Sequence, residues 1–160
     1  MKEFSELELE VIMDYCIDLA MQSPSTIYGP LVGAVIVSPN GEIIGKGYKT
    51  SLDRYFVQHA ERNALEDAKY DLPSGSTLFT TLEPCVKVRY NQIFRSCSEL
   101  IVEAGISMVV LGCDDNSPSM CGGKGKDYLR NHGVEVIYYG NLRKKIEKLL
   151  LNESCPRQIN

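Results

Sequence analysis

Three short stretches of the chain carry residue types that bind metal ions and move protons. They are His59-Ala60-Glu61, Glu83-Pro84-Cys85 and a single Cys97. One imidazole and two thiolates suit zinc, and three protein ligands leave the fourth tetrahedral position open for water, as in catalytic zinc sites. We therefore predict that His59, Cys85 and Cys97 bind Zn²⁺ as the cofactor.

Glu61 follows His59 by two positions, from where its carboxylate can reach the bound water without being a ligand. Cys97 is predicted at a helix N-terminus, where the helix dipole favours the thiolate. Each residue alone has an ordinary explanation, because a glutamate in a first turn or a histidine before a helix is common on protein surfaces. The combination, rather than any single residue, indicates a catalytic metal site.

The remaining cysteines are expected to be packing or incidental thiols. A reducing compartment disfavours a disulfide framework, and no third ligand lies near Cys113 and Cys121 for a second metal ion. These remaining cysteines are Cys16, Cys113, Cys121 and Cys155.

Hydrophobic periodicity predicts the elements that position these residues. A capping box of Ser5 and Glu8 starts a helix that runs to about residue 21, and a second helix over 60–70 opens at His59. The other predicted elements are strands over 32–37, 42–48, 77–82, 107–111 and 134–139, a helix over 97–104, a short helix closed by Gly133 and a last helix capped by Asn141.

This order predicts an α/β fold with three α-β-α layers and a five-stranded mixed sheet. Strands alternate with helices after an opening hairpin, which favours parallel pairing among the later strands. The length of 160 residues suits one domain, predicted over 1–151, with a frayed tail over 152–160.

The charge and hydrophobicity of the chain limit the kinds of partner that the protein can bind. The net charge is −4 and the sequence pI about 5.2, so the broad positive field that captures long nucleic acids is missing. No apolar run approaches the roughly 20 residues of a membrane helix, and acidic residues stand where a signal peptide would be apolar. We expect a cytoplasmic protein without a membrane partner.

The pattern His-x-Glu, then Pro-Cys and a later Cys, resembles the signature of the zinc-dependent cytidine deaminase superfamily. Further segments are similar to the riboflavin-pathway branch of that superfamily, the diaminohydroxyphosphoribosylaminopyrimidine deaminase domain, and the resemblance covers about residues 10–140. These segments are 32–37, 45–48, 59–66, 80–85, 102–106, 114–118 and 123–125.

The resemblance implies hydrolytic deamination of an aminopyrimidine, such as an aminopyrimidine ribose phosphate, to a carbonyl product and ammonia. Glu61 would carry the proton from water to the ring and then to the leaving amine, with Ala60 and Pro84 as substrate contacts. It also implies a homodimer or homotetramer. Three other functions remain open: a cytidine or deoxycytidylate deaminase, a tRNA-editing deaminase and a non-catalytic zinc-stabilised nucleotide-binding module.

Two departures from this pattern concern the substrate. Gly29-Pro30 stands where the similar sequences have Asn-Pro, and eleven residues separate the two ligand cysteines, a longer insertion than in those sequences. Three cations follow Cys85, which either form a solvated loop surface or hold a phosphate of a nucleotide substrate. We count them as candidate substrate-binding residues: Lys87, Arg89 and Arg95.

Overall fold

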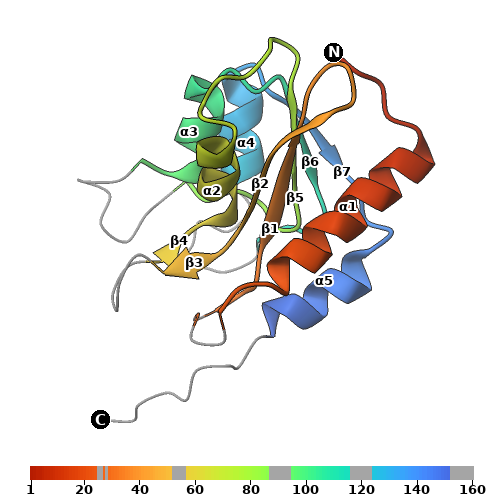
Figure 1. Cartoon of the computed structure of the whole chain (residues 1–160), viewed down its shortest axis with the longest axis vertical. Helices are drawn as coiled ribbons and strands as arrows, with labels where there is room; N and C mark the ends of the chain where they lie inside the picture. The colour runs from red at the N-terminus through yellow and green to blue at the C-terminus, as the bar shows by residue number, and fades with distance from the viewer. Residues whose placement is uncertain (25–26, 28, 52–56, 87–94, 116–123, 152–160) are drawn as a thin grey trace.

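A computed structural model of the chain shows a central sheet covered by helices on both faces (Figure 1). It describes residues 1–24, 27, 29–51, 57–86, 95–115 and 124–151. The strands are β1 (Gly33–Val37), β2 (Ile43–Tyr48), β3 (Thr50–Ser51), β4 (Val57–Gln58), β5 (Thr77–Thr80), β6 (Met108–Leu111) and β7 (Glu135–Tyr138). The helices are α1 (Glu6–Ala20), α2 (Ala60–Asp67), α3 (Cys97–Glu103), α4 (Lys124–Asn131) and α5 (Arg143–Leu150).

The main sheet is mixed and has the strand order β2-β1-β5-β6-β7. Strand β1 pairs antiparallel with both β2 and β5, whereas β5, β6 and β7 are parallel to one another. The register places Gly33 opposite Tyr48, and it aligns the carboxyl ends of β5 and β6 through Thr80 and Leu111. The segments that follow β2, β5 and β6 therefore leave the sheet at the same end.

The helices form the two outer layers. Helices α1 and α5 lie together on one face of the sheet, and α2, α3 and α4 cover the other (Figure 1). Strands β1, β5 and β6 are buried along their whole length, as expected for central strands covered on both faces. The predicted three-layer α/β architecture with a five-stranded mixed sheet is confirmed.

Glycines in β2 allow α2 to lie directly on the strand. A Cβ atom added to Gly47 would stand 2.4 Å from the Ala60 carbonyl oxygen, and one added to Gly45 would stand 2.4 Å from the Ala64 carbonyl oxygen. Both contacts are with backbone, which cannot move aside alone. The close approach of α2 to β2 thus fixes the position of the first turn of α2, which carries Glu61.

We expect Gly47→Ala to lower the free energy of unfolding by about 3 kcal/mol, because the added methyl group forces α2 away from β2. Urea denaturation followed by circular dichroism measures this change. The matched control is Lys46→Ala at the neighbouring exposed position of β2, with an expected change within about 0.5 kcal/mol. Equal stability of Gly47→Ala and the control would contradict the close approach.

Two predicted helix boundaries are corrected. The second helix ends at Asp67 rather than at residue 70, because Lys69 and Tyr70 adopt left-handed backbone angles with φ of 55° and 54°. Asn141 does not cap the last helix: it lies one residue before the N-cap, and its Nδ2 donates a hydrogen bond of 2.7 Å to Glu6 Oε1. Leu142 occupies the N-cap position instead, without a side-chain cap hydrogen bond.

The hairpin of β3 and β4 was not predicted, since its strands have only two residues each. The predicted tail over 152–160 lies outside the described residues. Within the part of the chain that the structure describes, no helix is both long and apolar enough to cross a lipid bilayer.

Candidate metal centre and active site

The side chains of His59, Cys85 and Cys97 come from three separate segments and meet at the start of α2. The His59 Nδ1 atom lies 3.6 Å from the Cys85 Sγ atom and 3.5 Å from the Cys97 Sγ atom, and the three atoms lie within 4.8 Å of one another. A tetrahedral site with Zn–S bonds of about 2.3 Å and Zn–N bonds of about 2.1 Å has N···S edges of about 3.6 Å. The donor set and its spacing therefore fit a zinc ion.

Local structure fixes the orientation of each donor. His59 is the N-cap of α2 with extended backbone angles, and its side chain makes no cap hydrogen bond, so the imidazole lies toward the two sulfurs. Cys97 opens α3, whose start is fixed by a capping box of Ser96 and Glu99. The Cys97 backbone N–H donates to Cys85 Sγ, and the Ser98 backbone N–H donates to the Cys85 carbonyl. The two cysteine segments are thus held together by backbone contacts.

Glu61 lies beside the cluster and is almost fully buried, with 4% of its surface exposed. Its charge interacts with His59 and Cys85, and the neighbouring Cys97 thiol favours the charged form of the carboxyl group. Burial raises the pKa of Glu61, although the charge of His59 opposes this shift. A buried carboxyl group with a raised pKa beside three metal-binding donor atoms is placed to accept and to release a proton.

The other groups of the cluster are electrostatically coupled. A hydrogen bond with Cys97 lowers the pKa of Cys85 to about 4, and the same contact raises the pKa of Cys97. Burial disfavours the charged form of His59, but its hydrogen bond with Cys85 and the charge of Cys85 raise the pKa of His59 overall. One thiolate is thus stabilised by its protein neighbours alone, which favours binding of a cation.

Glu83 holds the segment before Cys85 to two other parts of the fold. One carboxylate oxygen accepts a hydrogen bond of 3.1 Å from the Asp115 backbone N–H, and the other accepts one of 2.8 Å from the Lys126 backbone N–H near the start of α4. Gly125 packs so closely that an added Cβ would stand 2.2 Å from the Pro84 carbonyl oxygen. Glu83 therefore positions the Pro84-Cys85 segment between β6 and α4.

We expect Glu83→Ala to destabilise the protein by about 2–3 kcal/mol, because two backbone N–H groups lose a charged acceptor. Thermal and urea unfolding measure the loss. Glu83→Gln keeps one acceptor oxygen and should lose less than Glu83→Ala. If the two substitutions cost the same, the paired hydrogen bonds do not hold this segment.

The remaining predicted site residues are the candidate substrate contacts, which stay predictions. Ala60 is buried in the first turn of α2, and the Pro84 carbonyl accepts a hydrogen bond of 3.3 Å from Ser98 Oγ. Arg95 is exposed and forms an ion pair with Glu103, so it lies on the surface just before α3. Lys87 and Arg89 lie outside the described residues.

Of the other cysteines, Cys16 and Cys113 are buried thiols outside the cluster, as expected for packing residues. The predictions for Cys121 and Cys155 fall outside the described residues. Among the described residues, His59, Cys85 and Cys97 form the single group with the donor types and spacing to hold a metal ion.

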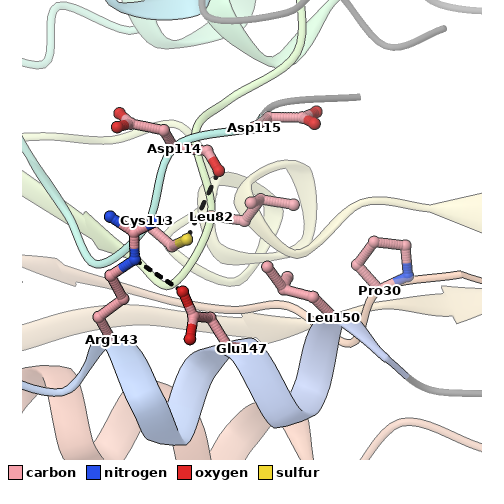
Figure 2. Close-up of a pocket in the computed structure, with 8 residues that line it drawn as sticks. All are labelled: Pro30, Leu82, Cys113, Asp114, Asp115, Arg143, Glu147 and Leu150. Carbon is pink, nitrogen blue, oxygen red and sulfur yellow. Dashed lines mark hydrogen bonds and ion pairs between the residues drawn. The ribbon is translucent and has the colours of Figure 1, made fainter. Parts of the chain in front are cut away.

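A separate pocket of about 280 Å³ lies against α5 (Figure 2). Like the Cys85 segment, it lies at the end of the sheet where β5 and β6 end. In this pocket Arg143 is paired with Glu147 at 2.7 Å, and the Cys113 thiol donates to the Asp114 carbonyl. Its lining contains neither the cluster nor Glu61; it consists of Pro30, Leu82, Cys113, Asp114, Asp115, Arg143, Glu147 and Leu150. The pocket is therefore distinct from the candidate metal centre.

Two residues of this region had no role assigned from the sequence: Glu83 and Lys49. Glu83 was part of the Glu83-Pro84-Cys85 stretch, but the sequence did not show that its carboxylate holds this segment in place. Lys49 directly follows β2 and is only 8% exposed, whereas Lys46 within β2 is exposed. Nothing in the local sequence marks this lysine as buried.

Comparison with known proteins agrees with this geometry. Residues 7–113 match the family model described as the cytidine and deoxycytidylate deaminase zinc-binding region. The riboflavin biosynthesis protein RibD of Actinobacillus pleuropneumoniae is 42% identical over 120 residues, which cover 75% of this chain and 29% of that protein.

Two solved structures extend the comparison. The deaminase/reductase of Thermotoga maritima that acts on diaminohydroxyphosphoribosylaminopyrimidine and 5-amino-6-(5-phosphoribosylamino)uracil has a TM-score of 0.76 and 37% identity, covering 90% of this chain and 39% of that one. The dCMP deaminase of cyanophage S-TIM5, in complex with dCMP and dUMP, has a TM-score of 0.65 and 25% identity, covering 86% of this chain and all of that one.

The present chain spans about a third of the length of the RibD relatives it matches. The family match covers about two thirds of the chain, and it includes His59, Glu61, Cys85 and Cys97. The chain therefore belongs to the cytidine and deoxycytidylate deaminase family, a family of hydrolytic deaminases.

Proposed function

We propose that this protein is a zinc-dependent hydrolytic deaminase of an aminopyrimidine nucleotide, with a riboflavin-type aminopyrimidine ribose phosphate as the first candidate substrate. The observation that carries the proposal is the buried Glu61 carboxyl group beside the His59, Cys85 and Cys97 donor atoms. Three ligands with one open position are typical of catalytic zinc sites, whereas structural sites have four protein ligands.

His59, Cys85 and Cys97 would hold the zinc ion. When bound, zinc supplies a Lewis acid that makes a water molecule acidic enough to act as a nucleophile near neutral pH. The protein's own side chains position the donor atoms and transfer the protons. Capping of α3 and the contacts of Cys85 with α3 keep the donors in place, so substrate binding need not organise them.

Glu61 acts as the proton carrier. Its carboxylate takes a proton from the attacking water and delivers it to a ring nitrogen, while the water oxygen bonds to the adjacent ring carbon and makes that carbon tetrahedral. The proton of the new hydroxyl group then passes through Glu61 to the amino group, the C–N bond breaks, and ammonia leaves as the carbonyl group forms. The net reaction consumes one water and replaces the amino group with a carbonyl oxygen.

Similarity to the RibD proteins supports the riboflavin-type substrate, and similarity to the cyanophage enzyme supports dCMP as a second candidate. Both are aminopyrimidines that carry a phosphorylated sugar. The acidic net charge of −4 argues against a long nucleic acid as the substrate, since such binding needs clustered cations along the phosphate backbone.

The experiment is a measurement of ammonia release by the zinc-loaded protein from a panel of pyrimidines. The panel contains the riboflavin-pathway aminopyrimidine ribose phosphate, dCMP, cytidine and tRNA, and mass spectrometry of the product checks the gain of about 1 Da on exchange of the amino group for oxygen. Release of ammonia from one of the phosphorylated pyrimidines is the expected result. A zinc-binding protein that acts on no member of the panel would be the non-catalytic module instead.

We also propose that the protein assembles as a homodimer or homotetramer, as the resemblance to its family implies. Light scattering coupled to size-exclusion chromatography measures the mass in solution. A monomer of 17.9 kDa across the micromolar range would contradict this part of the proposal.

A further inference from the structure

Helices α1 and α5 lie side by side on the face of the sheet opposite α2 and α3 (Figure 1). Two contacts join α1 and α5 at successive points. Asn141 Nδ2, just before α5, donates a hydrogen bond to Glu6 Oε1 at the start of α1. Further along both helices, Lys145 Nζ lies 2.8 Å from Asp14 Oδ1. Since earlier residues meet earlier ones and later residues meet later ones, the two helices run in the same direction.

An outward-facing row of side chains on α1 is apolar at its start and acidic at its end. Leu7 and Val11 are 70% and 59% exposed, and Asp18 is also exposed. Steps of three or four residues keep side chains on one side of a helix. The members of this α1 row are Leu7, Val11, Asp14 and Asp18. Its last three members also line a groove of about 420 Å³, together with Ile12, Tyr15 and Ile43.

The exposed side of α5 carries a shorter row with the opposite charge. Lys144 and Lys148 are exposed, and Leu151, the C-cap residue of α5, is 76% exposed. Steps of four and three residues keep these side chains on one side of the helix, and they form the α5 row. Within the described part of the chain, neither of these lysines has an ion-pair partner. The α5 row therefore offers two cations followed by an apolar side chain.

The two rows match in spacing and in chemistry when the helices are antiparallel. The α1 row, followed backwards from Asp18, takes a step of four residues and then one of three. The α5 row, followed forwards from Lys144, takes the same two steps. At a rise of about 1.5 Å per residue, the steps are about 6 Å and 4.5 Å long in both rows. Three pairs then face each other, two of opposite charge and one apolar: Asp18 with Lys144, Asp14 with Lys148, and Val11 with Leu151.

A second copy of the chain can supply the antiparallel partner. Within one chain α1 and α5 run in the same direction, so their rows cannot pair in this way. A two-fold axis that is perpendicular to the two helices and passes between them reverses the direction of both helices in the second copy. Each α1 row then faces the α5 row of the other copy, and the same contacts form twice. The two rows together are thus a self-complementary surface, the α1/α5 face.

We propose that the α1/α5 face is an interface between two copies of this protein, in which each α1 row binds the α5 row of the other copy. The inference rests on the proposed homodimer or homotetramer and names the surface that forms it. A basic or an acidic partner of another kind would match one row and repel the other, whereas a second copy matches both. The contact also removes the exposed apolar side chains of Val11 and Leu151 from water.

The test reverses the charges of one row at a time and measures self-association by analytical ultracentrifugation. Lys144→Glu together with Lys148→Glu makes the α5 row acidic, and Asp14→Lys together with Asp18→Lys makes the α1 row basic. Like charges then face each other, so each double variant should have a Kd for self-association at least about tenfold higher than that of the native protein. An equimolar mixture of the two variants should regain the native affinity, because every contact between them again joins an acid to a base.

The control is Lys124→Glu together with Arg130→Glu, two exposed positions of α4 on the other face of the sheet, and it should keep the native Kd. Thermal unfolding of each variant verifies that the fold is kept. Salt is an independent measurement: about 1 M salt screens exposed charges and should raise the native Kd about tenfold. A native Kd that does not change with salt would contradict the pairing of charged rows.

The outcomes separate this interface from the proposed function. If both double variants associate like the native protein, or if their mixture stays dissociated, the copies meet through another surface, and the proposed homodimer or homotetramer stands without the α1/α5 face. A native protein that is a monomer contradicts both the proposed assembly and this interface. Ammonia release tests the deaminase independently, because the charges reversed here lie on the face of the sheet opposite α2 and α3.

Discussion

Glu61→Gln is expected to lower kcat by about 10³–10⁴-fold while the protein keeps its zinc, because an amide cannot carry a proton between water and the amine. The substitution preserves the size of a side chain that is almost fully buried, so the fold should be maintained. Ammonia release under saturating substrate measures kcat. Elemental analysis of the purified variant measures zinc.

The matched control is Glu66→Gln, the same chemical change five residues later on the exposed face of α2. It should keep the native kcat, since Glu66 lies outside the site. If Glu61→Gln retained more than a tenth of the native kcat with zinc bound, another group would have to be the proton carrier. If the variant lost its zinc, Glu61 would belong to the ligand set.

Cys97→Ser is expected to remove both zinc and activity. A neutral serine hydroxyl is a far weaker zinc ligand than a thiolate, and the two remaining donors, His59 and Cys85, cannot complete a three-ligand site. Binding of zinc to the folded state stabilises it by mass action, so zinc should raise the melting temperature of the native protein but not of the variant. Differential scanning calorimetry with and without added zinc measures this difference.

Cys113→Ser is the control, because Cys113 is a buried thiol outside the cluster and its thiol donates to a backbone carbonyl that a hydroxyl can also reach. This variant should keep one zinc per chain and the native activity. A Cys97→Ser protein that still bound one zinc tightly would show that a different residue completes the site. Eleven residues separate Cys97 from Cys85, so the spacing in the sequence is weak support for Cys97 as a zinc ligand. The test therefore decides this assignment.

The local elements of the fold could be predicted from sequence because their signals are local. The capping box of Ser5 and Glu8 was predicted at the start of α1 and is present in the structure, whereas the capping box of Ser96 that starts α3 was found only in the structure. Runs of apolar residues predicted the five main strands, and the order of strands and helices predicted the parallel pairing of β5, β6 and β7. The chemistry of His59, Glu61, Cys85 and Cys97 was predicted from residue type and order.

Contacts between distant segments could not be predicted in this way. Asn141 has the residue type of an N-cap, yet it binds Glu6, which lies 135 positions earlier in the sequence. Lys69 and Tyr70 continue a helical pattern, yet both take left-handed backbone angles that end α2. In both cases a competing local or tertiary interaction outweighs a weak propensity.

The sequence by itself thus determined the class of the fold and the set of reactive side chains, because these follow from periodicity and residue chemistry. The tertiary structure alone decided that the His59, Cys85 and Cys97 donor atoms lie within 4.8 Å of one another, since that depends on the docking of α2 and α3 on the sheet. It also decided that Lys49 is buried. The physical reason is that burial results from how closely α2 approaches Gly45 and Gly47, and that approach is a property of two elements packed together.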